Sequence, residues 1–468
     1  MSSRAETLRA LRARRASKRA ALQADYLAPV DQASFQMSRA TGRAQGMQCV
    51  WIYERPVDLD GVRRFQQYFG RGLGGRLIEP SPLPFGRHRW VASPPPPTEL
   101  DIAAPRPRSE FSDWLDERSQ LPVDPEFGPG WHLGVLPMTD GSTAIALVGS
   151  HCLADGVGAV LQTVLSIKEE TRDFGLRPPR SRSRARALAA DARQTLHDVP
   201  VLARTLKNAG RLAYRKRDEL MTAGGSPAAT PVVSDDSVVV IPAVAMFVDI
   251  DEWDRKAADL GGNSYALLSA VGAKLGERMG RRHHDADDGG VTLLIAISDR
   301  TLDDTRAHAM EFVNVNVDPE QVTADLTETR ARLRTAIKKL REESDEAFEL
   351  LPLTPFVPKR AIQKLGDVIF GFNDLPVACS NLGDMDPTLG RLDGTDADYV
   401  MLWGVDQNVK RCDIERAGGQ LVLVSARMNG RVIICITAYQ SGTENSKARL
   451  RELATDTLAE FDLAGVIV

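Results

Sequence analysis

A histidine, a carboxylate and a glycine stand close together in the first half of the chain. His151 directly follows an apolar run that ends at Gly149 and Ser150, Asp155 comes four residues later, and Gly156 comes next. This pattern predicts a buried strand that delivers His151 to a tight turn. A neutral imidazole in that place can take a proton from a bound hydroxyl or amine, because the histidine pKa lies near neutrality.

Three predicted elements would hold this histidine in position. Residues 131–137 and 145–148 are two apolar strands, and an Asp-Gly pair between them predicts a hairpin turn. Residues 157–167 are apolar at helical spacing, so a helix is expected directly after the motif. His151 would therefore lie in the interior, at the end of a hairpin strand and in front of a helix.

The pattern His-x-x-x-Asp-Gly after an apolar strand resembles the motif of the CoA-dependent acyltransferase superfamily. That superfamily includes chloramphenicol acetyltransferase, polyketide-associated acyltransferases and the condensation domains of peptide synthetases. Further blocks in the same order resemble the bacterial wax ester synthase/diacylglycerol acyltransferase family, and the resemblance covers most of the chain from about Asp25 onward. These blocks are Leu27-Ala28-Pro29-Val30-Asp31 with Phe35, Pro129-Gly130-Trp131, Ile295-Ala296-Ile297-Ser298-Asp299-Arg300, Phe312-Val313-Asn314 and Ser380-Asn381-Leu382-Gly383.

The resemblance implies an α/β fold of two chloramphenicol-acetyltransferase-like domains that face each other across a central tunnel. A chain of 468 residues is itself too long for one ordinary core, so two domains are expected on length alone. The predicted division has four parts. They are a basic N-terminal arm (1–24), an N-terminal half that carries the motif (25–176), a basic crossover arm with a linker (177–237) and a C-terminal half (238–468).

The residue types suggest a role for each member of the site. His151 is the expected general base, and no acyl-enzyme is expected, because Cys152 would face the opposite side of a continuing strand. The resemblance implies a structural role for Asp155, and Arg300 is its predicted partner. Gly156 is expected to permit the turn and to bring the backbone close to the acyl carbonyl. The candidates for oxyanion stabilisation or substrate positioning are Asn314, Ser380 and Asn381.

The implied reaction moves an acyl group from acyl-CoA to the hydroxyl of a lipophilic acceptor, such as a long-chain alcohol or diacylglycerol. Acyl-CoA is then a co-substrate, and no permanently bound cofactor is expected. Two alternatives stay open. One is a polyketide-associated or condensation-type acyltransferase whose donor sits on an acyl carrier protein, and the other is a non-catalytic member that binds acyl chains. Two departures from the wax ester synthase pattern bear on this choice: Ser150 stands where that family has a second histidine, and Asn263-Ser264 stands where it has Asn-Asp.

Composition restricts the location and the partners. The net charge of −4 gives no general case for nucleic acid, and no run of about 18 to 20 apolar residues predicts a membrane span. Five cysteines without a C-x-x-C pair predict neither a disulfide framework nor a zinc site, which favours the cytoplasm. The basic residues in 4–19 and 177–217 are a solvated arm or a contact for acidic groups. Those groups would be anionic lipid headgroups of the inner membrane face or of a lipid droplet, or the phosphates of a CoA ester.

Two further clusters have less specific readings. The glycine-rich residues 70–75 lack the Gly-Lys-Ser/Thr ending of a phosphate loop, so a flexible connection is expected. The His and Asp residues in 281–288 lack regular ligand spacing and stand before two glycines, so we interpret them as a loop. No metal site is therefore predicted.

Overall fold

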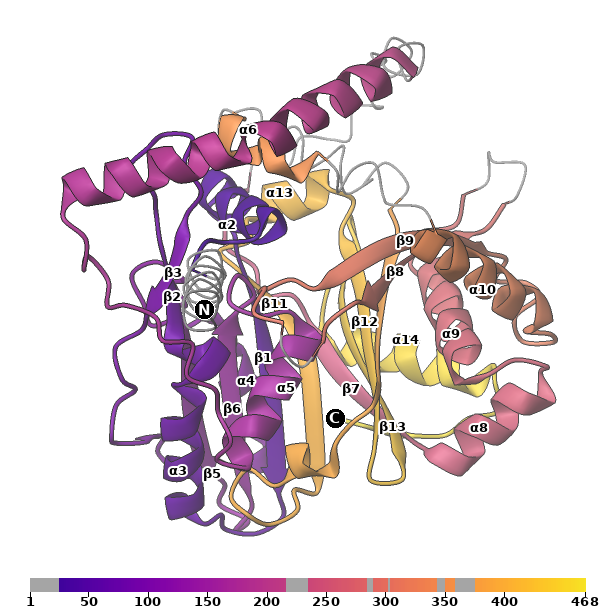
Figure 1. Cartoon of the computed structure of the whole chain (residues 1–468). Helices are drawn as coiled ribbons and strands as arrows, with labels where there is room; N and C mark the ends of the chain where they lie inside the picture. Colours follow the sequence, from indigo (N-terminus) through magenta and orange to yellow (C-terminus); the bar gives the residue numbers. More distant parts are fainter. Residues whose placement is uncertain (1–24, 216–234, 284–288, 302–303, 343–349, 358–374) are drawn as a thin grey trace, which may run out of the picture.

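The computed structural model of the chain consists of two α/β lobes, each built around one large sheet (Figure 1). It describes residues 25–215, 235–283, 289–301, 304–342, 350–357 and 375–468. The predicted N-terminal arm, the linker at 222–227 and most of the 281–288 loop lie outside these residues. Within the described part of the chain, no helix combines the length and the apolar character that a membrane crossing needs.

The first lobe is organised around a five-stranded sheet with the strand order β11-β1-β6-β5-β4. Helices α3 and α5 pack on one face of this sheet, and α4 packs on the other. Successive side chains of β1 point to opposite faces, so they contact different helices. Trp51 contacts Phe65 of α3, whereas the side-chain amide of Gln48 donates to the Leu115 carbonyl of α4. The strands are β1 (Ala44–Tyr53), β4 (Asp101–Ile102), β5 (Trp131–Pro137), β6 (Thr143–Ser150) and β11 (Tyr399–Gln407), and the helices are α3 (Leu59–Phe69), α4 (Phe111–Gln120) and α5 (Gly156–Ile167).

The second lobe is organised around a seven-stranded sheet with the order β14-β7-β13-β12-β10-β8-β9. Strands β12 and β13 form a hairpin, and its turn residues Asn429 and Gly430 both have positive φ (50° and 71°), as a two-residue hairpin turn requires. The strands are β7 (Ala243–Asp249), β8 (Val291–Ser298), β9 (Met310–Val317), β10 (Val377–Asp384), β12 (Gln420–Met428), β13 (Arg431–Tyr439) and β14 (Val466–Ile467), and the helices are α8 (Ile250–Asp259), α9 (Ser264–Arg278), α10 (Thr327–Glu342) and α14 (Lys447–Ala459).

Smaller elements connect and cover the two lobes. Helix α6 is long and lies across one end of the molecule, and its C-terminal part extends beyond the body of the protein (Figure 1). These elements are α2 (Pro29–Thr41), η1 (Gly72–Gly75), β2 (Arg76–Glu79), β3 (Arg89–Ala92), η2 (Arg108–Glu110), α6 (Arg184–Arg215), η3 (Leu351–Phe356), η5 (Pro387–Gly390) and α13 (Arg411–Arg416).

The structure contains one strand pairing that the sequence does not predict. Strand β11 comes from the C-terminal half but pairs with β1, so the first sheet combines strands from both halves of the chain. In the second sheet, β10 continues to Asp384, so Ser380 and Asn381 both lie within the strand. Beyond Ser380 this strand still pairs with β12, with an irregularity before Asp384.

Candidate active site

His151 is the first residue after β6 and belongs to the turn that leads into α5. Its backbone N–H donates to the Gln45 carbonyl at 2.8 Å, which continues the pairing of β6 with β1 by one residue. The next residues, Cys152, Leu153 and Ala154, are buried, whereas His151 remains partly exposed. The hairpin of β5 and β6 therefore carries the imidazole to a fixed position that a substrate can reach.

The imidazole of His151 contacts a second histidine. Its Nδ1 lies 3.2 Å from Nε2 of His308, and Nδ1 of His308 lies 3.0 Å from Oδ1 of Asp31. His308 and Asp31 are both buried. His308 is not predicted from the sequence, because it lies between two strands at no recognisable spacing from the motif. Asp31 was only one residue of a resembling block, with no role attached.

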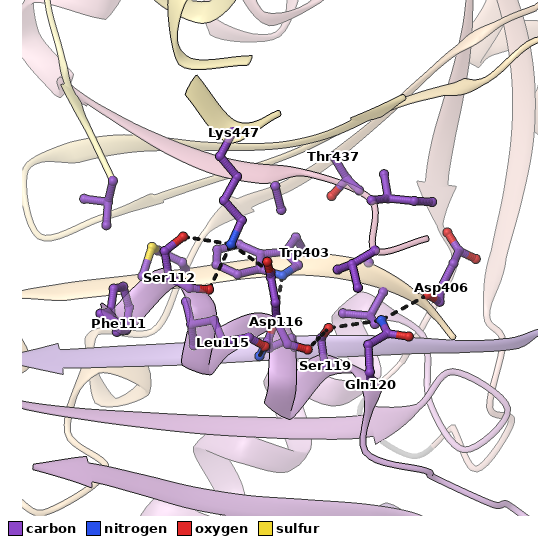
Figure 2. Close-up of a pocket in the computed structure, with 18 of the residues that line it drawn as sticks. Phe111, Ser112, Leu115, Asp116, Ser119, Gln120, Trp403, Asp406, Thr437 and Lys447 are labelled. Carbon is purple, nitrogen blue, oxygen red and sulfur yellow. Dashed lines mark hydrogen bonds and ion pairs between the residues drawn. The ribbon is translucent and has the colours of Figure 1, made fainter. Parts of the chain in front are cut away.

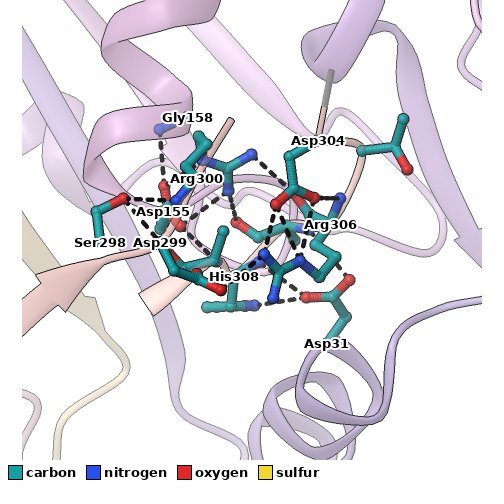
Figure 3. A network of polar contacts seen from close by, with 12 residues as sticks. Asp31, Asp155, Gly158, Ser298, Asp299, Arg300, Asp304, Arg306 and His308 are labelled. Atoms are coloured by element: carbon teal, nitrogen blue, oxygen red, sulfur yellow. Dashed lines mark hydrogen bonds and ion pairs between the residues drawn. The ribbon is translucent and has the colours of Figure 1, made fainter. Parts of the chain in front are cut away.

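Asp155 and Arg300 form the predicted ion pair (Figure 3). Nη2 of Arg300 donates to Oδ2 of Asp155 at 2.8 Å and Nε donates to Oδ1 at 3.2 Å, and both side chains are at most 2% exposed. Asp155 also caps α5, because its Oδ1 accepts from the Gly158 N–H at 2.7 Å. Its Oδ2 accepts from the Ala309 N–H at 2.7 Å. The carboxylate thus fixes the turn after His151 to the segment between β8 and β9.

The charge state of the site follows from burial and from these neighbours. Burial is the largest cause that lowers the pKa of His151 to about 4; the nearby His308 contributes in the same direction, and Asp155 opposes the shift. The His151 imidazole is therefore neutral at pH 7 and able to accept a proton. Burial by itself would raise the pKa of Asp155, but the hydrogen bonds and charge of Arg300 outweigh this effect and lower it. Asp155 is accordingly a carboxylate that is already neutralised by its partner.

The structure contradicts one part of the expectation for Gly156, namely that the turn requires glycine there, whereas the approach of its backbone to the acyl carbonyl stays a prediction. Gly156 is the first residue of α5 and does not have a positive φ, and an added Cβ would meet only Leu382, at 3.4 Å. Glycine is therefore not required there for the turn. The tighter position is Gly158, where a Cβ would lie 3.0 Å from the guanidinium carbon of Arg300 and 3.1 Å from Oδ1 of Asp155. The absence of a side chain at 158 allows the buried ion pair to approach α5.

The three candidates for oxyanion stabilisation or substrate positioning lie in different places. Leu382 of β10 faces Gly156, so the neighbouring Ser380 and Asn381 lie near the start of α5, although the Asn381 carboxamide oxygen accepts from the Gly383 N–H at 2.9 Å. Asn314 is exposed in the middle of the edge strand β9. Five residues, four of them in β9, lie between it and His308, so the six backbone steps span roughly 20 Å. The structure therefore does not bring Asn314 to His151.

An apolar cavity begins beside the motif and follows α5. It encloses about 560 Å³ and is lined next to His151 by Ser150, Leu153 and Ala154. A second apolar cavity of about 340 Å³ shares Val160, Leu389 and Leu402 with the first and continues to other side chains, including Met428 and Ile433. The shared residues show that the two cavities adjoin at Val160 of α5, and the second extends from there toward β12 and β13.

Comparisons with solved structures identify the architecture. The wax ester synthase/diacylglycerol acyltransferase from Marinobacter aquaeolei VT8 matches with a TM-score of 0.54 and 14% identity, over 93% of this chain and 98% of that one. The first condensation domain of the CDA synthetase gives 0.55 and 11%, over 94% and 99%. The TRI3 trichothecene 15-O-acetyltransferase from Fusarium sporotrichioides gives 0.56 and 9%, over 93% and 94%. The chain has the CoA-dependent acyltransferase fold. No protein-family model matches the sequence, and a search of curated proteins finds no match.

The predicted fold class is therefore confirmed: two chloramphenicol-acetyltransferase-like lobes form this acyltransferase fold. At identities of 9 to 14%, these comparisons establish the fold and do not identify the acyl donor or the acyl acceptor. Within the described parts of the chain, no cluster of His, Cys, Asp and Glu side chains is arranged to hold a metal ion.

A further cavity of about 600 Å³ lies between the lobes of this acyltransferase fold and is more polar (Figure 2). Lys447 of α14 reaches across it, and its ammonium lies 2.8 Å from Oδ1 of Asp116 in α4. The cavity is lined by Gln48 and by residues of α4, whereas the apolar cavity is lined by Met47, Cys49 and residues of α5. Because these β1 side chains point to opposite faces, the sheet separates the polar cavity from the one beside His151.

Proposed function

We propose that the protein is an O-acyltransferase that moves an acyl group from acyl-CoA to a hydroxyl group of a lipophilic acceptor, such as a long-chain alcohol or diacylglycerol. One observation carries this proposal: a neutral, partly exposed His151 lies in the turn whose neighbouring residues Ser150, Leu153 and Ala154 line an apolar cavity. The two groups that the reaction needs, a general base and a place for a hydrocarbon chain, are thereby adjacent. The acyltransferase fold is consistent with that chemistry.

The proposed reaction proceeds in two steps without an acyl-enzyme. In the first, Nε2 of His151 takes the proton of the acceptor hydroxyl while the oxygen attacks the thioester carbonyl, so a carbon–oxygen bond forms and an oxyanion develops. In the second, the carbon–sulfur bond breaks and the departing thiolate takes the proton back from Nε2. The products are the ester and free CoA. Ser380 and Asn381 stay our proposals for groups near the oxyanion.

The lining of the cavity supports a hydrocarbon chain as its occupant. The side chains of Phe69, Leu73, Trp131 and Leu147 form its walls beyond the motif. Each methylene group that moves from water into such surroundings contributes about 0.8 kcal/mol. A long acyl or alkyl chain that extends past Val160 would therefore bind much more strongly than an acetyl group. This preference is the basis for a lipophilic substrate.

The proposal is tested by measuring CoA release with a thiol reagent. The full-length protein is incubated with hexadecanoyl-CoA and either hexadecanol or diacylglycerol, and the ester is identified by mass spectrometry. We expect ester and CoA in equal amounts, and a loss of at least about 100-fold in kcat for His151→Ala, because general base catalysis contributes about 10² to 10⁴. The matched control is His197→Ala, which removes an exposed histidine of α6 and should leave the rate unchanged.

Three results would change the conclusion. Equal rates for His151→Ala and the unaltered protein would remove His151 from the chemistry. Ester formation only from an acylated carrier protein would assign the donor to the condensation-type alternative. Binding of acyl-CoA without any ester from either donor would identify the non-catalytic, acyl-binding alternative.

We also propose that α6 rests on an anionic membrane surface. Its apolar residues recur every three or four positions and lie on one side that faces solvent, where Leu196 is 72% and Leu206 is 60% exposed. Its two acidic residues, Asp191 and Asp198, are paired with arginines of the protein. The apolar positions are Leu188, Ala192, Leu196, Val199, Ala203 and Leu206.

A row of basic residues runs beside this apolar side of α6. Arg193, Arg204, Lys207 and Arg211 are exposed, and among the described residues none of them is paired with a carboxylate. A helix with an apolar stripe next to unpaired cations fits an interface of lipid headgroups and acyl chains. Each cation near an anionic surface adds about 1 kcal/mol of attraction, which salt screens. A membrane-bound acceptor would then reach the enzyme without crossing water.

Sedimentation with lipid vesicles tests this surface. We expect the protein to bind vesicles that contain phosphatidylglycerol more than pure phosphatidylcholine vesicles, and to dissociate at high salt. The triple variant Arg193→Glu, Arg204→Glu and Lys207→Glu should lose binding. The matched control makes the same charge change on α10 at Lys338, Lys339 and Arg341 and should keep it. Equal binding by both triple variants would refute the assignment to α6.

A further inference from the structure

In the hydrogen bond between His151 and His308, the surrounding geometry identifies which ring is the donor and which is the acceptor. We propose that His308, held by Asp31, is a positioning residue that fixes the tautomer of His151, so that the proton sits on Nδ1 and the lone pair on Nε2 faces the substrate. This inference rests on the proposed function of His151 as a general base. It adds two residues, from opposite parts of the chain, to the group that the reaction needs.

The orientation begins at the Asp31 carboxylate, which is fully buried in the first turn region of α2. Oδ1 accepts from the His308 backbone N–H at 2.8 Å, and Oδ2 accepts from the Ala307 N–H at 3.0 Å. An ionised carboxylate has no proton to donate, so it must also accept the hydrogen bond that it shares with the His308 side chain. Nδ1 of His308, 3.0 Å from Oδ1, therefore carries a proton.

The tautomer of His308 then determines that of His151. A neutral imidazole with its proton on Nδ1 has a lone pair on Nε2. That atom lies 3.2 Å from Nδ1 of His151, so the hydrogen between the rings belongs to His151 Nδ1. The two rings are stacked with an offset, their planes 22° apart and their centroids 5.2 Å apart, and the two facing nitrogens remain within hydrogen-bonding distance. Nε2 of His151 is consequently unprotonated.

The opposite tautomer would disable the base. If Nδ1 of His151 accepted a hydrogen bond, its proton would sit on Nε2, and that atom could not take a proton from an alcohol. Two neutral tautomers of an isolated imidazole are both accessible, so a fixed partner at Nδ1 is the device that selects one of them. Three other charged groups lie close to the motif: Asp155 and Arg300 bind each other, and Arg76 donates to the Leu153 carbonyl.

A pair of amide variants at position 308 separates positioning from structure. His308→Gln keeps an acceptor at about the place of Nε2, because its carboxamide oxygen reaches as far as that nitrogen. His308→Asn keeps a donor for Asp31 but is too short to reach His151. We expect His308→Gln to retain kcat within about tenfold of the unaltered enzyme, and His308→Asn to lose about 100-fold or more in kcat with little change in the KM for acyl-CoA.

The tautomer itself is measured by nitrogen-15 NMR of the imidazole in the full-length protein, with the His151 signals assigned by their absence from His151→Ala. We expect a protonated Nδ1 and an unprotonated Nε2 in the unaltered protein and in His308→Gln, and a mixture of tautomers in His308→Asn. Asp31→Asn should act in the same direction, because a carboxamide nitrogen facing His308 would reverse both rings. Circular dichroism and thermal unfolding identify any variant that fails to fold.

The two measurements distinguish failure of this inference from failure of the proposed function. In one outcome, the protein transfers no acyl group and still shows a proton on Nδ1 of His151 that disappears in His308→Asn. That outcome would keep the positioning role of His308 and would reject the proposed acyl transfer. Equal activity in the folded Asn and Gln variants would overturn the positioning. So would a proton on Nε2 of His151 in the unaltered protein.

Discussion

The buried ion pair between Asp155 and Arg300 permits a quantitative test of how the site is held together. Replacing Arg300 with methionine removes the guanidinium and keeps most of the hydrocarbon volume. In the native protein this group donates to both carboxylate oxygens of Asp155, to the Arg306 carbonyl at 3.1 Å and to the Ala307 carbonyl at 2.8 Å. The variant leaves a carboxylate that is 1% exposed with two backbone N–H donors and no counter-charge.

The expected cost follows from that burial. Removing one partner of a buried pair costs about 3 to 5 kcal/mol in the free energy of unfolding, because the remaining charge is left without compensation. The matched control is Arg391→Met, whose partner Asp396 lies 2.6 Å away but whose pair is 54% and 59% exposed. Exposed pairs contribute about 0 to 1 kcal/mol. The two substitutions remove the same group, so their difference measures burial.

Urea unfolding followed by tryptophan fluorescence gives both free energies. The double variant Asp155→Asn with Arg300→Met has no buried charge, so it should be more stable than the sum of the two single effects, by about 0.5 to 3 kcal/mol. A loss below about 1 kcal/mol for Arg300→Met, or an equal loss for the exposed control, would show that the pair does not hold the turn. Strict additivity in the double variant would lead to the same conclusion.

Three further outcomes are expected. The pKa of His151 is lowered to about 4, and only the unprotonated ring is a base. The value of kcat/KM should therefore stay level from pH 7 to about pH 5 and fall as the pH approaches 4. A fall centred at about pH 6.5 would contradict the lowered pKa. Val160→Phe fills the cavity junction and should lower kcat/KM for hexadecanoyl-CoA relative to butyryl-CoA by tenfold or more, whereas Val466→Phe, at a 53% exposed site, should not. Gly158→Ala places a methyl group against the ion pair and should lower the free energy of unfolding in urea by about 1 to 3 kcal/mol. Gly210→Ala in α6 meets open space, so it should be neutral or raise that free energy by up to about 1 kcal/mol. Equal effects of the two substitutions would reject the close approach of Gly158 to the ion pair.

The parts of the site that follow local rules could be predicted from the sequence. The apolar runs of β5 and β6, their Asp-Gly turn and the amphipathic spacing of α5 are short-range signals, and the structure confirms all three. Asn263 also follows a local rule, because its side chain accepts from the Ala266 N–H at the start of α9. Arg300 is predicted as the partner of Asp155, and the structure confirms that pair.

The remaining parts depend on contacts between distant residues. Strand β11 joins the first sheet next to β1, although more than 340 residues separate paired positions such as Ala44 and Gln407. No local pattern specifies such a pairing. His308 has no motif of its own, and its role appears only when Asp31 and His151 are seen on either side of it. Gly156 was misread because the first residue of a helix has ordinary dihedral angles.

Residues 304–309, which precede β9 of the second lobe, join the chemistry of this protein to the association of its lobes. They contact the first lobe, where Nη1 of the buried Arg76 donates to the Thr305 carbonyl at 2.5 Å and Nη2 donates to the Leu153 carbonyl at 2.6 Å. The residues that secure this docking flank the ones that orient His151. A half that carries only the His-x-x-x-Asp-Gly motif therefore contains the base without the groups that hold its turn and its tautomer. Because the base comes from one lobe and its supports from the other, separation of the lobes removes the active arrangement even when each sheet stays folded.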